Sequence, residues 1–165
     1  MTVIALIGYR GSGKTTLGRL LAEALNVGFV DSDEAVLAET GHGRVADAWA
    51  FLGEEGWRER EAAVLPPLLG GDGVVALGGG AVLVPEVAKA LAEARVVWLR
   101  ASAAVLRDRI AEGDDRPPLQ GGSAVDEVEA VLAQREPIYR RLANASIDTS
   151  GNLADAADAM MRAVS

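Results

Sequence analysis

The sequence has 165 residues, a length that favours one domain large enough to bury an extensive core. Half of the residues are hydrophobic and 24% are charged, as in globular chains, and no apolar run approaches the roughly 20 residues that cross a bilayer. The net charge of −8 argues against a nucleic-acid partner, and the absence of cysteine excludes disulfides, thiolate nucleophiles and cysteine-bound metals. The N-terminal segment has neither a basic region nor a small-residue cleavage site, so we expect a cytoplasmic protein that does not contact membranes.

Short apolar runs alternate with helical patterns along the chain. The strand-like runs cover residues 3–7, 28–31, 74–77, 96–99 and 145–148. The helical patterns cover residues 14–25, 33–40, 44–69 with an interruption near Gly53, 86–93, 102–111, 125–143 and 153–163. Strands that are apolar at successive positions are usually covered on both faces, and strand–helix alternation is typical of a parallel sheet. We therefore predict a doubly wound α/β fold.

Residues 112–123 break this alternation. They lack an apolar period. Arg116 lies near their centre, followed directly by Pro117-Pro118 and then by Gly121-Gly122. A loop of this length in a compact domain is usually functional or disordered. We interpret residues 112–124 as a mobile lid, and a solvated surface loop is the alternative.

A phosphate-binding loop lies between the first strand and the first helix. Residues 8–15, Gly-Tyr-Arg-Gly-Ser-Gly-Lys-Thr, match the pattern G-x-x-x-x-G-K-[ST]. In such a loop, backbone N–H groups and a helix N-terminus surround the phosphates. Lys14 can reach the β- and γ-phosphates, and the Thr15 hydroxyl can ligate Mg²⁺. The pattern predicts an ATP site formed by Gly11, Ser12, Gly13, Lys14, Thr15 and Thr16.

Nucleotide binding alone does not determine the reaction. A GTP-dependent switch needs a guanine-reading motif of the Asn-Lys-x-Asp type, and the only other lysine, Lys89, lies in Ala-Lys-Ala-Leu. Motor and AAA-type ATPases usually end an apolar strand in Asp-Glu, and none of the predicted strands does so. The remaining class is the small phosphotransferases.

Two further segments follow the second and third strands, at the sheet edge where doubly wound folds bind ligands. The first is Asp31-Ser32-Asp33. Because the two aspartates are two positions apart, we expect their side chains to point to the same side of an extended chain. One could hold Mg²⁺, and the other could orient or deprotonate an acceptor hydroxyl; alternatively, Asp33 caps the following helix. The second segment, Gly78-Gly79-Gly80, suits close approach of backbone to a small ligand, or else forms a strand-ending turn.

Three basic residues have an ordinary interpretation when they are considered alone. Arg58 and Arg135 lie in helical patterns, where an exposed arginine paired at i+3 or i+4 is the simplest explanation. His42, in Gly-His-Gly, is interpreted as a surface loop residue.

The order and spacing of these segments resemble the shikimate kinase family over nearly the whole chain. The resemblance is carried by residues 8–16, 31–33, Thr40-Gly41, Gly53-Glu54, Trp57-Arg58, 78–80, Arg116-Pro117, Arg135 and Tyr139-Arg140. It implies a three-layer α/β/α P-loop NTPase fold similar to the nucleoside monophosphate kinases, with strand order 2-3-1-4-5. It implies one kinase domain over residues 1–165, with a substrate-binding subdomain at about 33–61. The implied activity is ATP-dependent, Mg²⁺-requiring phosphorylation of the 3-hydroxyl of shikimate, towards chorismate and the aromatic amino acids. We expect the protein to be a monomer.

The resemblance also implies roles for individual residues. Lys14, Asp33 and Arg116 would be catalytic, with Arg116 carried over the phosphates by the lid. Asp33, Arg58, Gly78, Gly79, Gly80 and Arg135 would bind the substrate, the two arginines gripping its carboxylate. Arg109 would flank the adenine, and Asn152 would lie at the same end of the nucleotide. Thr15 and Asp31 would hold the metal ion.

Three segments depart from the family pattern. Tyr9-Arg10 adds a bulky pair and a cation near the phosphates, Trp49 replaces an expected aliphatic residue, and residues 150–152 lack a basic residue that some relatives place by the adenine. Two alternatives stay open: another small P-loop kinase, acting on gluconate or a nucleotide, and a nucleotide-binding regulatory module without transfer activity.

Overall fold

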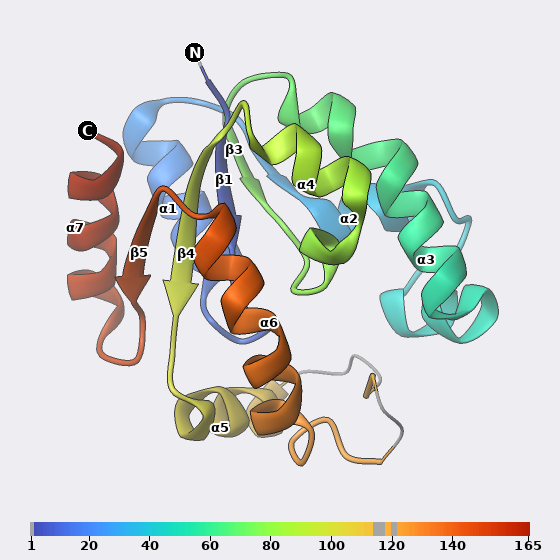
Figure 1. Cartoon of the computed structure of the whole chain (residues 1–165). Helices are drawn as coiled ribbons and strands as arrows, with labels where there is room; N and C mark the ends of the chain where they lie inside the picture. The colour runs from blue at the N-terminus through green and yellow to red at the C-terminus, as the bar shows by residue number, and fades with distance from the viewer. Residues whose placement is uncertain (1, 114–117, 120–121) are drawn as a thin grey trace.

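A five-stranded parallel sheet forms the centre of the computed structural model, which describes residues 2–113, 118–119 and 122–165. The strands are β1 (Ile4–Ile7), β2 (Phe29–Asp31), β3 (Val74–Ala76), β4 (Arg95–Arg100) and β5 (Ala145–Asp148). They lie side by side in the order β2-β3-β1-β4-β5 (Figure 1), which confirms the predicted order. β1 is central, and Ile4 is in register with Val74 on one side and Arg95 on the other.

The helices follow the predicted segments to within a few residues. They are α1 (Lys14–Leu25), α2 (Ser32–Ala38), α3 (Val45–Leu69), α4 (Pro85–Leu91), α5 (Ala103–Gly113), α6 (Val128–Leu142) and α7 (Leu153–Val164). α3 is kinked at Gly53 (φ 71°, ψ 175°), where the sequence predicted an interruption. A short 3₁₀ helix, η1 (Ala81–Leu83), was not predicted, since three residues after a glycine run show no periodicity. Within residues 2–113, 118–119 and 122–165, no helix combines the length and apolarity needed to cross a membrane.

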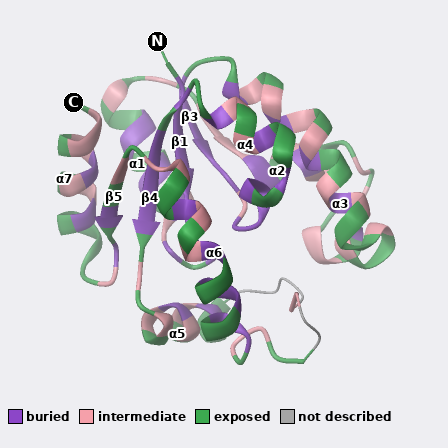
Figure 2. Cartoon of the chain, in the orientation of Figure 1, coloured by how far each residue is buried: buried purple, intermediate pink, exposed green. Residues whose placement is uncertain are grey.

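Both faces of the sheet are covered by helices. Along β1, Ala5 and Ile7 pack with residues of α3, α4 and α6, whereas Ile4 and Leu6 pack with residues of α1 and α7. This alternation follows from the period of two in a strand. Figure 2 shows the result: β1 is buried along its length and β4 is buried between its exposed end residues Arg95 and Arg100. The predicted doubly wound three-layer fold is confirmed.

A third, smaller apolar cluster lies beyond the sheet edge. Tyr9, in the loop after β1, packs with Leu106 and Ile110 of α5 and with Val128 and Val131 of α6. Through this cluster the loop after β1 is packed against both α5 and α6. The phosphate loop therefore has an apolar anchor in addition to the strand and helix that flank it.

Candidate active site

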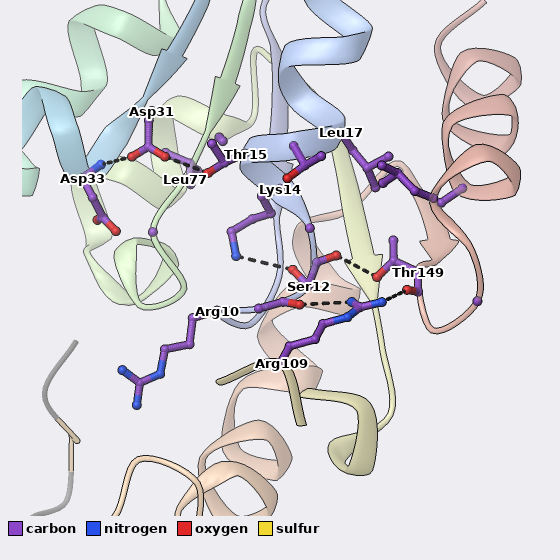
Figure 3. Close-up of a pocket in the computed structure, with 18 residues that line it drawn as sticks. Arg10, Ser12, Lys14, Thr15, Leu17, Asp31, Asp33, Leu77, Arg109 and Thr149 are labelled. Atoms are coloured by element: carbon purple, nitrogen blue, oxygen red, sulfur yellow. Dashed lines mark hydrogen bonds between the residues drawn. The ribbon is translucent and has the colours of Figure 1, made fainter. Parts of the chain in front are cut away.

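The phosphate loop connects β1 to α1 with its backbone turned inward. Gly11 and Gly13 have φ values of 82° and 95°, in a region that residues with a Cβ rarely occupy. The Lys14 ammonium donates to the carbonyl oxygens of Gly8 at 2.6 Å and Tyr9 at 2.9 Å. It also points towards the Ser12 hydroxyl at 3.5 Å (Figure 3). Lys14 is thus held at the inner side of the loop, where a bound phosphate chain would lie.

Two side chains from distant elements fix the same loop. The Thr149 hydroxyl, after β5, donates to the Ser12 carbonyl oxygen at 2.7 Å. Arg109 of α5 donates to the Gly11 carbonyl oxygen at 3.0 Å and to that of Thr149 (Figure 3). The role of Thr149 was not predicted, because a threonine in Asp-Thr-Ser carries no signal that distinguishes it from a turn residue.

A cavity of about 490 Å³ opens in front of this loop. It is lined by residues 11–16 and Arg109, all predicted to contact ATP, and by Thr149, Gly151 and Leu153 at one end. The Asn152 side chain accepts a hydrogen bond from the Asp155 N–H and so caps the start of α7. The predicted contact of Asn152 with the nucleotide stays a prediction.

Asp31 connects the phosphate loop to β2. Its Oδ2 accepts a hydrogen bond from the Thr15 hydroxyl at 2.9 Å, and its Oδ1 accepts from the N–H groups of Asp33 at 2.9 Å and Glu34 at 3.2 Å. Asp31 is therefore the N-cap of α2, and the alternative that Asp33 caps this helix is wrong. The hydroxyl and carboxylate oxygens at this point are the hard ligands that Mg²⁺ prefers, so both residues fit the ion.

The expectation that the two aspartates share one side of an extended chain was also wrong in its reason. β2 ends at Asp31 and α2 begins at Ser32, so Asp33 lies in the first turn of a helix. Both residues nevertheless line the large cavity. Figure 3 shows Asp31 beside Thr15 and Asp33 further along the cavity wall.

A second, narrower cavity of about 60 Å³ adjoins the first. The two cavities share Arg10, Asp33 and Gly78 in their walls, so Asp33 borders both. The second is further lined by Arg58, Glu61, Gly79, Gly80, Arg135, Leu119 and the aromatic residues Trp49 and Trp57. We call it the acceptor cavity.

Arg58 and Arg135 come together in the acceptor cavity from helices α3 and α6. The Arg135 residue is 6% exposed and its guanidinium lies 5.8 Å from the Tyr9 ring centre. The Arg58 side chain is 17% exposed and donates to Glu61 Oε1 at 2.7 Å, which is an i+3 pair. The interpretation of both as exposed helical arginines is wrong, since a solvated face would leave them open to water.

Glu61 is the buried partner of Arg58. It is 0% exposed, and burial raises the pKa of its carboxyl to about 7, against the opposing effect of the Arg58 cation. The negative charge of Asp33 raises this pKa further. Sequence reasoning gave Glu61 no role, because a Glu in a Glu- and Arg-rich helix is usually a surface residue. Its only sequence signal is its i+3 spacing from Arg58.

The glycine triplet is explained by its neighbours. A Cβ on Gly78 would lie 2.5 Å from Asp33 Oδ1, one on Gly79 would lie 3.2 Å from Arg135 Nη1, and one on Gly80 would overlap the Arg58 guanidinium. Each glycine therefore makes room for one charged side chain of the acceptor cavity. The segment also forms the turn between β3 and η1, as the alternative interpretation held. Its close approach to a small ligand stays a prediction.

Tyr139 of α6 is hydrogen-bonded to this glycine segment. Its hydroxyl donates to the Gly79 carbonyl oxygen at 2.6 Å, and its ring packs 5.9 Å from that of Trp98. Burial raises the pKa of Tyr139 to about 12, so the hydroxyl keeps its proton and remains a donor at physiological pH.

The other predicted residues lie as follows. Arg116 is outside the described residues. The His42 ring packs against that of Phe51 in a tilted arrangement, with ring centres 5.3 Å apart, and His42 lines neither cavity, as expected of a loop residue. Trp49, a departure from the family pattern, lies in the acceptor cavity wall and contacts both the Trp57 ring and the Arg58 guanidinium.

The family model and the sequence relatives point to the same family. The family model described as "Shikimate kinase" matches residues 10–165. The shikimate kinase of Mycobacterium avium is 44% identical over 146 residues, 88% of this chain and 82% of the relative. That of Halorhodospira halophila is 43% identical over 155 residues, 92% of this chain and 86% of the relative. The structure of the Acinetobacter baumannii shikimate kinase in complex with shikimate superposes with a TM-score of 0.91 at 33% identity, covering 99% of this chain and 93% of that one.

Proposed function

The chain belongs to the shikimate kinase family, and we propose on this basis that it transfers the γ-phosphate of ATP to the 3-hydroxyl of shikimate. Among the observations on the site, the one that carries the proposal is the shared wall between the two cavities. Asp33 borders both the cavity of the phosphate loop and the cavity that holds Arg58 and Arg135. A phosphate donor and a carboxylated acceptor would therefore meet at Asp33.

The acceptor cavity supports a small carboxylic acid with hydroxyl groups. Two guanidinium groups from different helices suit bidentate recognition of a carboxylate. Asp33 at the opposite boundary suits a hydroxyl, and the Gly79 backbone can add an N–H donor. A cavity lined by two arginines has no obvious purpose in a nucleotide-binding regulatory module without an acceptor.

We assign the chemistry to positioning and charge neutralisation, as in other phosphoryl transfers. Lys14 would neutralise charge on the β- and γ-phosphates, and Asp33 would orient the acceptor hydroxyl for in-line attack and accept its proton. Thr15 and Asp31 would hold Mg²⁺, which supplies further positive charge at the phosphates when bound. Arg109 would flank the adenine, with Asn152 at the same end.

Arg116 completes the proposal on the family pattern alone. It would approach the transferred phosphoryl group and stabilise its charge. The domain division follows the same pattern: residues 33–61 would form the substrate-binding subdomain, which the contributions of Asp33, Arg58 and Glu61 to the acceptor cavity support. We further propose that a monomer is active, because every assigned group lies in one chain, and that the protein works in the cytoplasm, where ATP is supplied.

An acceptor panel tests the proposed function. ADP release would be coupled to NADH oxidation with MgATP and, in parallel, shikimate, gluconate or a nucleoside monophosphate. We expect turnover with MgATP and shikimate, and none with gluconate or the nucleoside monophosphate. Turnover with gluconate or a nucleotide instead would assign the chain to another small kinase. ATP binding by calorimetry without binding of any acceptor would support a regulatory module.

A further inference from the structure

Glu127 lies between the acceptor cavity and the phosphate loop. It directly precedes α6 and is 7% exposed. The phosphate-loop residue Arg10, itself 8% exposed, donates from Nη2 to Glu127 Oε1 at 3.1 Å. This buried ion pair joins residues 117 positions apart in sequence.

The same carboxylate binds the backbone of Leu119. The Leu119 N–H donates to Glu127 Oε1 at 2.9 Å and to Oε2 at 2.8 Å, so both oxygens share one donor. A hydrogen bond to an ionised acceptor is stronger than one between neutral groups, particularly where water is excluded. Glu127 therefore holds the backbone of Leu119 at a defined place.

Leu119 in turn forms part of the acceptor cavity wall and packs against the apolar cluster of Tyr9, Leu106 and Ile110. Because this cavity is only about 60 Å³, a shift of one wall side chain changes the room for an acceptor substantially. Arg10 lines both cavities. The contacts thus run from the phosphate loop through Glu127 to the acceptor wall.

The obvious structural role for a residue before a helix does not account for this side chain. Glu127 makes no side-chain capping hydrogen bond to the first turn of α6. Its oxygens are directed to Arg10 and Leu119 instead. Burying a carboxylate is costly, and the hydrogen bonds from the Arg10 cation and the Leu119 N–H offset that cost.

We propose that Glu127 is a positioning residue for the acceptor: it fixes Leu119 in the wall of the acceptor cavity and, through Arg10, ties that wall to the phosphate loop. The inference rests on the proposed function for the identity of the acceptor, and on the contacts above for the role of Glu127. Arg10, the extra cation of this chain's phosphate loop, has its place in the structure explained by this pair.

The test compares Glu127→Ala and Glu127→Gln with a matched control, Glu129→Gln. Glu129 lies in the first turn of the same helix and pairs with Arg107 at 3.0 Å, but its side chain is 72% exposed and lines neither cavity. KM for shikimate, KM for ATP and kcat would be measured for each protein, together with the thermal midpoint. Wild-type turnover of shikimate in the same assay tests the proposed function separately.

For Glu127→Ala we expect shikimate KM to rise about tenfold or more, with ATP KM and kcat within about threefold of wild type, because a charge-assisted hydrogen bond that places a wall residue is lost. Glu127→Gln keeps an oxygen for the Leu119 N–H and should recover part of the loss. Glu129→Gln should match wild type. An unchanged shikimate KM in both Glu127 variants would overturn the proposal, even if the thermal midpoint fell. So would a rise in the KM for ATP equal to the rise in the KM for shikimate.

Backbone amide exchange of Leu119, followed by NMR, gives a readout that needs no activity. We expect exchange at this amide to accelerate about tenfold or more in Glu127→Ala and less in Glu127→Gln, with Glu129→Gln unchanged. If the Ala variant fails to fold, the comparison between the two Gln variants decides. Equal exchange at Leu119 in those two proteins would contradict the positioning role.

Discussion

The Thr15 hydroxyl donates to Asp31 Oδ2 at 2.9 Å and so joins the phosphate loop to the end of β2. The other oxygen of the same carboxylate begins α2 by accepting from the Asp33 and Glu34 N–H groups. One aspartate therefore fixes both the proposed metal ligand Thr15 and the helix turn that presents Asp33. Asp31 thus connects the proposed metal ligand Thr15 of the phosphate loop to Asp33, the residue proposed to orient the acceptor hydroxyl.

This relationship predicts how metal dependence responds to Asp31→Asn. Asparagine is as good an N-cap as aspartate, so the start of α2 should be kept while the negative charge near the proposed ion is lost. We expect the Mg²⁺ concentration for half-maximal activity to rise by about fivefold or more, with shikimate KM little changed. Titration of activity with Mg²⁺ at saturating ATP and shikimate measures it. An unchanged Mg²⁺ requirement would remove Asp31 from the metal site.

Asp33→Asn tests the group at the boundary between the cavities. The amide keeps the size of the side chain but cannot accept a proton from the acceptor hydroxyl. We expect kcat to fall by more than about a hundredfold, equivalent to roughly 2.7 kcal/mol of transition-state stabilisation. A variant with near-normal kcat would show that Asp33 neither orients nor deprotonates the hydroxyl.

Arg58→Ala tests carboxylate recognition. Because Arg58 is placed to bind the acceptor rather than the transferred group, the main effect should be a rise in shikimate KM of about tenfold or more. Arg60→Ala on the same helix is the control: Arg60 is exposed and donates to the Glu39 carbonyl oxygen, away from both cavities. Equal KM values for the two variants would show that Arg58 does not bind the acceptor.

Glu61 predicts a pH-dependent stability. Its pKa of about 7 in the folded chain lies above the value of 4.5 for an unperturbed glutamate, so folding takes up a proton between these pH values. The free energy of unfolding of the wild type should therefore fall, relative to Glu61→Gln, as pH rises from about 4.5 to about 7. Urea unfolding of both proteins at several pH values measures the difference. A difference that does not vary with pH would show that the Glu61 carboxyl titrates normally.

Much of this fold could be predicted because its signals are local. The phosphate loop has a specific residue pattern, and the interruption near Gly53 was visible in the helical pattern of residues 44–69. The strand order was predicted through the family resemblance alone. The acceptor arginines could be assigned only through that resemblance, since the i+3 spacing of Arg58 and Glu61 is the same on a solvated helix as in a buried pair.

The contacts that sequence reasoning missed are long-range. Thr149 binds Ser12, 137 positions away in the sequence, and Glu127 binds Arg10, 117 positions away. The sequence around Thr149 and around Glu127 contains no motif that indicates these contacts. The helical pattern of residues 33–40 did predict the helix that contains Asp33, but the expectation of an extended Asp31-Ser32-Asp33 was wrong. β2 ends at Asp31, and the Asp31 side chain itself begins the helix.

Identification of the product of the wild-type reaction tests the central claim most directly. The chain would be incubated with MgATP and shikimate, and the phosphorylated product assigned by ³¹P and ¹H NMR. Meeting of the two cavities at Asp33 predicts one new phosphate ester on the acceptor, formed in step with ADP, and the proposed function places it at the 3-oxygen of shikimate. Release of ADP at the same rate without shikimate, or a phosphate on a different acceptor or oxygen, would contradict it.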